Sequence, residues 1–210
     1  MRPLRLLVLS SMLLATAMAN ADWSANLGWT SDYYFRGIFQ KSSSASAGID
    51  YDSNGFYAGT WIADVDGPFG DGLEVDGYFG YGGEVGNFGY GVGFTGYYYT
   101  GDFDDTYQEI NLSGSYGWVT VDAAIGEYNN FDGPTLSYQF YSVTLEKNGI
   151  YGKYGSFQDE ASGDYFEFGY SATVAEIDLA VYLLTTDEDL GGGSRNESLV
   201  FTIGKSFDLN

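Results

Sequence analysis

The chain has 210 residues, with 29 acidic against 8 basic side chains, and it contains neither cysteine nor histidine. The formal charge of −21 argues against nucleic acid as a partner, because binding to phosphates needs clustered Lys and Arg. Without Cys or His, the usual nucleophiles and acid–base groups of enzymes are missing. We therefore expect no enzyme, no catalytic residue and no cofactor.

Residues 1–21 are predicted to be a cleavable secretory signal. Arg2 and Arg5 give a positive start, and an apolar core follows over residues 6–15. Small residues allow cleavage after Ala19 or after Ala21, and we favour Ala21. The apolar core is too short for a membrane-spanning helix, and no later segment has the roughly 18 apolar residues that such a helix needs. Residues 22–210 are expected to form one domain, which would enter a membrane only as a barrel.

After residue 22 the chain alternates between apolar and polar residues with the two-residue period of β-strands. In the first strand, Trp23, Ala25, Leu27 and Trp29 share one face. The pattern predicts an all-β fold of about twelve strands. Their approximate ranges are 23–30, 45–52, 56–65, 73–82, 88–99, 106–116, 118–128, 135–147, 150–157, 164–173, 176–185 and 197–208.

The predicted connections alternate between short and long. Short turns are expected at residues 53–55, 83–87, around 117, 148–149 and 174–175. Longer polar segments are expected at residues 31–44, 66–72, 100–105, 129–134, 158–163 and 186–196. This layout is typical of a single up-and-down antiparallel transmembrane β-barrel, with short periplasmic turns and longer extracellular loops.

One face of each predicted strand is apolar and is expected to face lipid. Basic side chains there would cost about 2–4 kcal/mol at mid-depth, so they should be scarce. The predicted lipid-facing residues include Leu73, Val75, Phe79, Tyr81, Ile110, Leu112, Val119, Val121, Ile125, Phe166, Phe168, Tyr170, Ile177, Leu179, Val181, Leu183, Leu199, Phe201 and Ile203.

The opposite face carries acidic residues, which are expected to line the lumen. Carboxylates in a narrow lumen concentrate cations and repel anions, so the pattern favours a cation-preferring pore. The alternative is a lumen filled by Tyr side chains, Trp61 and a folded loop, with the acids solvated at the mouths. The predicted pore-lining residues are Asp50, Glu74, Asp76, Glu109, Asp122, Glu167, Glu176 and Asp178.

Only six basic residues follow the signal, and Arg36 is notable among them because it lies in an aromatic segment. Asp32 and Arg36 share strand parity, so Arg36 is expected to pair with Asp32 or with inward acids. Arg36 has two possible roles. It would hold the first strand, or the loop that follows it, against the barrel wall, or it would select substrates. Acidic segments at residues 64–67, 71–72 and 102–105 offer oxygen ligands to Ca²⁺ or Mg²⁺, but they lack EF-hand spacing, and we expect no metal site.

The segment from Ser31 to Gln40 resembles a motif of the TorF family of porin-like proteins, also described as the Gcw_chp domain: Ser-Asp-Tyr-x-Phe-Arg-Gly-Ile-Ser-Gln. Phe39 stands where the family has Ser. A second block at residues 55–66 is similar to the family's Gly-Phe-Tyr-Ala-Gly-x-Trp segment. The matching motif residues are Ser31, Asp32, Tyr33, Phe35, Arg36, Gly37, Ile38 and Gln40. The resemblance implies a bacterial outer-membrane location and a pore.

The predicted function is passive diffusion of small solutes through an outer-membrane porin with cation preference. The leading alternative is a non-conducting structural or adhesive outer-membrane barrel with acidic surface loops, and a third is a soluble periplasmic β-sandwich. The C-terminal residues 202–209 resemble the signal that barrel-assembly machinery recognises in a last strand. Expected partners are therefore that machinery, outer-membrane lipid and lipopolysaccharide, and small solutes or cations, with no prediction of oligomeric state.

Overall fold

The computed structural model describes residues 22–67, 70–159 and 162–209, and the predicted signal of residues 1–21 lies outside these ranges. The described residues form twelve β-strands, which confirms the all-β prediction. The strands are β1 (Asp22–Phe35), β2 (Ile38–Ser53), β3 (Phe56–Gly67), β4 (Gly70–Val85), β5 (Phe88–Tyr99), β6 (Tyr107–Tyr116), β7 (Val119–Tyr128), β8 (Leu136–Lys147), β9 (Ile150–Asp159), β10 (Gly163–Val174), β11 (Ile177–Thr186) and β12 (Glu197–Asp208). Within the same ranges, no helix is long and apolar enough to cross a membrane.

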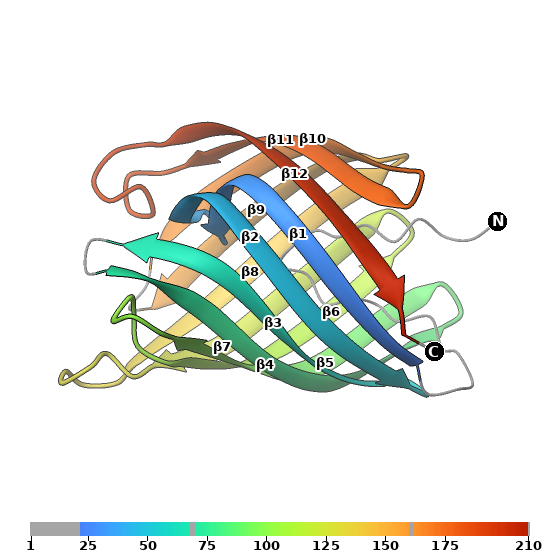
Figure 1. Cartoon of the computed structure of the whole chain (residues 1–210), viewed down its shortest axis with the longest axis horizontal. Coiled ribbons are helices and arrows are strands. Elements are labelled where there is room, and N and C mark those ends of the chain that lie inside the picture. Colours follow the sequence, from blue (N-terminus) through green and yellow to red (C-terminus); the bar gives the residue numbers. More distant parts are fainter. Residues whose placement is uncertain (1–21, 68–69, 160–161, 210) are drawn as a thin grey trace.

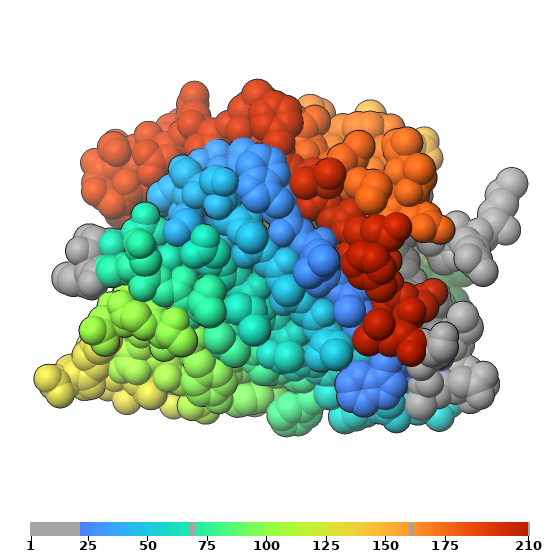
Figure 2. Space-filling view, in the orientation of Figure 1, coloured from blue at the N-terminus to red at the C-terminus, as the bar shows by residue number. Residues whose placement is uncertain are grey.

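The strands form one closed antiparallel barrel in which each strand pairs with its neighbours in sequence (Figure 1). The barrel closes where β1 pairs with β12, from Ser24 opposite Asp208 to Thr30 opposite Thr202. Closure leaves no strand edge with unpaired backbone groups. On the face seen in Figure 2, the coloured strands form a continuous wall. The predicted up-and-down barrel topology is confirmed.

Two-residue turns connect the strands at the end of the barrel that carries Asp22 and Asp208, which we name the turn end. At Asn54-Gly55 both residues have positive φ, 52° and 89°. The type I′ hairpin turn requires this backbone, which Asn and Gly adopt at little cost. Ala175 and Glu176 form a similar turn with φ of 51° and 63°. Strand β11 therefore begins at Ile177, one residue later than predicted.

The opposite end, the loop end, carries longer connections after β5, β7 and β11, as predicted. The prediction of a loop at residues 31–44 was wrong, because β1 and β2 continue to a two-residue turn at Arg36-Gly37. The predicted loop at residues 66–72 is likewise mostly strand, in β3 and β4. The Ser-rich residues 42–44 were included in the predicted loop, yet Ser42 and Ser44 pair in register with β1. Polar strand residues are tolerated where one face of a strand points into a barrel.

The outer surface is a belt of apolar side chains, and every residue predicted to face lipid is exposed or half-exposed. Leu112 and Ile125, for example, expose 47% and 56% of their surface. Side chains at alternate positions on the same strands turn inward, as the buried Glu109 and Ala124 show. Exposed apolar area of this extent is typical of a surface covered by lipid.

Leu112→Arg should destabilise the barrel by about 2–4 kcal/mol, because Leu112 lies in the middle of β6 on the outward face. Tyr116→Arg is the matched control, since Tyr116 ends the same strand and is 65% exposed. Its expected cost is about 0–1 kcal/mol, because charge is tolerated near the membrane interface. Urea unfolding of the barrel in lipid vesicles measures the loss of stability caused by each substitution. Equal losses would contradict the assignment of this face to lipid.

Candidate functional site in the barrel interior

The tip of the β1–β2 hairpin bends into the barrel, where the blue ribbon curls behind β2 in Figure 1. The register between the two strands shifts between Tyr33 and Tyr34, a bulge that bends the hairpin. The turn that follows places Arg36 and Gly37 at φ of 49° and 85°. The residues of the predicted loop thus form a folded hairpin inside the barrel.

Arg36 is buried, with 6% of its surface exposed, and it forms a bidentate ion pair with Glu109 on β6. Nη1 donates to Oε2 at 2.8 Å and Nη2 donates to Oε1 at 2.6 Å. The guanidinium also lies over the Phe140 ring, 4.3 Å from its centroid, and near the Phe35 ring at 4.9 Å. Of the two pairings expected for Arg36, the structure shows the one with an inward acid.

Three further side chains hold Glu109 in place. The hydroxyls of Tyr97 and Tyr138 donate to its two oxygens at 2.7 and 2.8 Å, and the Asn111 amide donates at 2.5 Å. Glu109 therefore receives hydrogen bonds from β5, β6 and β8 in addition to the hairpin. A buried ion pair tolerates burial only when its remaining oxygen and nitrogen atoms are bonded in this way.

Gly37 contacts the wall so closely that a side chain would not fit. A Cβ added there would lie 2.7 Å from Cβ and 2.8 Å from Cγ of Tyr165 on β10. Together with its positive φ, this contact explains why Gly follows Arg in the motif. The hairpin tip is thereby in contact with β6, β8 and β10.

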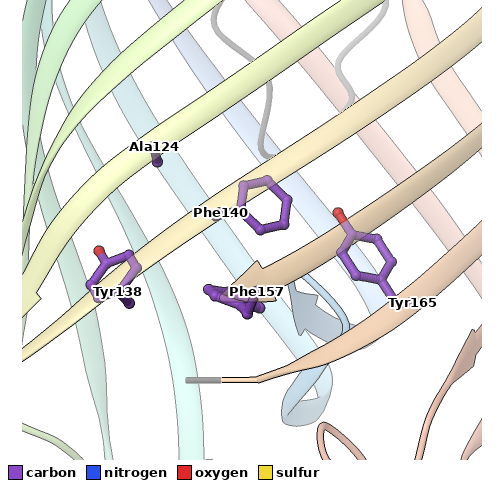
Figure 3. Packing of buried hydrophobic residues seen from close by; sticks show 5 residues of the cluster. All are labelled: Ala124, Tyr138, Phe140, Phe157 and Tyr165. Carbon is purple, nitrogen blue, oxygen red and sulfur yellow. The ribbon is translucent and has the colours of Figure 1, made fainter. Parts of the chain in front are cut away.

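An aromatic cluster on β7 to β10 forms the wall behind the tip (Figure 3). Its buried members are Ala124, Tyr138, Phe140, Phe157 and Tyr165. Leu190, from the connection between β11 and β12, packs against the same cluster. The alternation of side chains along the strands predicts that these rings point inward, since Tyr165 alternates with the outward Phe166. The sequence gives no sign of which residues the rings contact.

A second buried cluster lies on the other side of the hairpin and contains Tyr33, Ala63 and Val65. Phe103, from the connection between β5 and β6, packs against it. The Tyr33 hydroxyl donates to Glu74 Oε1 at 2.6 Å. Both faces of the hairpin are therefore packed, and loops from two sides contribute to the packing at the loop end.

The predicted acidic residues fall into three groups. Five are buried on inward strand positions, with at most 9% of their surface exposed: Asp50, Glu74, Asp76, Glu109 and Glu167. Asp122 and Asp178 are half-exposed, and they accept hydrogen bonds from Ser142 and Thr173 respectively. Glu176 does not face the interior, because it lies in the β10–β11 turn with its side chain 85% exposed and paired with Lys205.

Sequence reasoning missed a second basic residue inside the barrel. Lys153 on β9 is 2% exposed and lies opposite Glu167 in the β9–β10 register. Its inward position follows from the alternation of β9, where the neighbouring Tyr154 is 47% exposed. The described interior thus carries two cations, Arg36 and Lys153, each next to one carboxylate.

Other motif residues lie along the hairpin. Asp32 accepts a hydrogen bond from Ser42 at 2.9 Å, and Gln40 donates to the Ile38 carbonyl at 3.2 Å. Phe39, which replaces the Ser of the family motif, packs its ring on Tyr34 with centroids 5.3 Å apart. No group of acidic residues in the described ranges has a metal-ligating arrangement of three or more.

A hollow lies inside the turn-end half of the barrel, below the hairpin. It is lined by residues of β1, β2, β3, β10, β11 and β12, among them Asn26, Ser46, Trp61, Ser171 and Thr202. The lining combines small polar side chains with glycine, alanine and larger apolar residues. The interior is therefore packed at the loop end and open in part toward the turn end.

A closed twelve-stranded antiparallel barrel with an apolar outside and a polar interior has the fold of porin structures. This chain belongs to the Gcw_chp family, described as bacterial proteins of unknown function, whose sequence model matches residues 14–133. A search of curated proteins found no sequence relative.

Among solved structures, the KdgM porin superposes with a TM-score of 0.58 and 9% identity over 89% of this chain and 99% of its own. A structure from a report on in-meso crystallization of membrane proteins superposes with a TM-score of 0.57 and 7% identity, over 90% of this chain and 84% of its own. The outer membrane phospholipase A of Escherichia coli superposes with a TM-score of 0.46 and 10% identity, over 89% of this chain and 90% of its own. At these identities the likeness concerns the fold alone.

Proposed function

We propose that this chain is an outer-membrane channel for passive diffusion of small solutes, that it prefers cations, and that the β1–β2 hairpin restricts its lumen. The porin fold and the apolar belt support the membrane location. The motif at residues 31–40 supports the closer assignment to the TorF type of porin-like protein. Residues 1–21 would direct the chain through the inner membrane and be removed.

The charge balance of the interior carries the proposal. Of the predicted acidic side chains, seven lie on inward strand positions, together with two basic side chains, Arg36 and Lys153. The seven are Asp50, Glu74, Asp76, Glu109, Asp122, Glu167 and Asp178. Arg36 neutralises Glu109, and Lys153 lies opposite Glu167, so five of the predicted acids are left in excess. Excess negative charge in a narrow, low-dielectric lumen attracts cations and repels anions.

The packing of the hairpin favours a second function, a non-conducting structural or adhesive barrel. Glu74, Glu109 and Lys153 are at most 2% exposed, so these side chains beside the hairpin are closed to water in this conformation. Conduction therefore requires the hairpin to move away from the wall. In the non-conducting function the hairpin would be a permanent part of the core.

Planar-bilayer recording of the refolded barrel separates the two functions. A channel closed by a movable hairpin predicts stepwise openings from wild-type protein that has been shown to be folded and inserted. Asp50→Asn with Asp76→Asn should keep those openings and reduce their cation selectivity, whereas Glu176→Gln, in the exposed turn, should leave selectivity unchanged. Complete silence of a folded, inserted barrel would support the structural or adhesive function instead.

A further inference from the structure

Two buried carboxylates on β4 each have an oxygen without a hydrogen-bond partner among the described residues. Glu74 is fully buried and its Oε2 has no partner, and Asp76 is 8% exposed and its Oδ1 has none. The two residues are two positions apart on one strand, so their side chains leave the same face of the wall. Both point into the interior beside the hairpin.

The described basic side chains do not neutralise this pair. The ion pairs within residues 22–67, 70–159 and 162–209 join Arg36 to Glu109, Lys41 to Asp64 and Lys205 to Glu176. Arg36, the nearby cation, is held by both of its terminal nitrogens on Glu109. An uncompensated buried charge costs several kcal/mol, so a carboxylate in this position needs a cation or a proton.

The surroundings of the pair suit a cation that prefers oxygen ligands. Glu74 already accepts a hydrogen bond from Tyr33 on Oε1, which orients Oε2 as a free acceptor. Asp76 lies opposite Trp61 on β3, and Trp61 also lines the hollow in the turn-end half. The hollow thus reaches the residue opposite Asp76.

We propose that Glu74 and Asp76 together bind one divalent hard cation of the Ca²⁺ class in the barrel interior. Two carboxylates match its two charges, and carboxylate oxygens are the ligands that Ca²⁺ prefers. The inference deepens the proposed function by naming a cation site beside the restricting hairpin. Cation binding does not depend on conduction, so the proposed cation site and the proposed channel function can fail separately.

Calcium binding to the whole refolded barrel in detergent tests the site. Isothermal titration should show one saturable site, and Tb³⁺ used as a Ca²⁺ probe should emit on excitation of the protein, since Trp61 lies opposite Asp76. Glu74→Gln and Asp76→Asn should each weaken binding at least about tenfold, as removal of a ligand does. Glu84→Gln, an exposed acid on the same strand, is the matched control and should bind like wild type.

The site is refuted if wild-type barrel shows no saturable Ca²⁺ binding, or if both variants bind as wild type does. Should a variant not fold, infrared spectra of the wild-type barrel decide the question. A protonated-carboxyl band that persists in Ca²⁺ would mean that protons occupy the pair, which overturns the proposal, whereas loss of the band on adding Ca²⁺ supports it. Binding without conductance would refute only the channel, and conductance without binding would refute only the site.

Discussion

Arg36→Ala should raise the open probability and conductance of the barrel in planar bilayers. Arg36 supplies the bidentate contact of the hairpin with Glu109 and packs on Phe140. Removing one member of a buried ion pair costs about 3–5 kcal/mol, because the other is left as an uncompensated buried charge. The strand pairs of the wall do not involve the Arg36 side chain, so we expect the cost to appear as release of the hairpin with the barrel retained.

Two variants control this experiment. Arg195→Ala removes the same charge from an exposed position in the connection before β12, so its conductance should match wild type. Arg36→Lys keeps the charge but loses the planar two-nitrogen contact, and it should give an intermediate result. An Arg36→Ala barrel that is folded and conducts as wild type would contradict a restricting role for the hairpin.

A disulfide between the hairpin and the wall should close the channel reversibly. A Cβ on Gly37 would lie 2.7 Å from the Tyr165 Cβ, and a disulfide joins Cβ atoms about 3.5–4.5 Å apart, so a small retreat of the tip suffices. The chain has no cysteine of its own, so Gly37→Cys with Tyr165→Cys creates a single pair. Oxidised protein should be almost silent, and reductant should restore openings.

The oxidised and reduced states are compared in the same double-cysteine variant. This comparison removes the effect of the substitutions themselves, including the loss of the Tyr165 ring. Each single-cysteine variant should show no response to reductant. If the oxidised and reduced double variants conduct equally while gel mobility shows that the bridge has formed, the hairpin does not control passage.

The sequence was sufficient to predict the barrel, because its strands are local patterns. Period-two alternation and the Asn-Gly turns at 54–55 and 148–149 each lie within a few residues. The same parity separates the outward Ile110 from the inward Glu109. It failed at Glu176, because the two-residue turn lies one residue later than predicted and so includes Glu176.

The inward hairpin was beyond sequence reasoning because its contacts are long-range. Arg36 and Glu109 are 73 residues apart, and Gly37 contacts Tyr165 on β10. Ser42 to Ser44 resemble a loop in composition, and only pairing with β1 shows them to be strand. The rarity of basic residues identified Arg36, and strand parity identified Glu109, but no local signal joined the two.

The most direct test of a cation-preferring channel is the reversal potential of single wild-type channels in a KCl gradient across a planar bilayer. The predicted acids inside the barrel exceed the interior basic residues by five, so we predict a reversal potential of the sign expected for selectivity for K⁺ over Cl⁻. A reversal potential that favours Cl⁻ would contradict the assignment of the acidic interior to the permeation path.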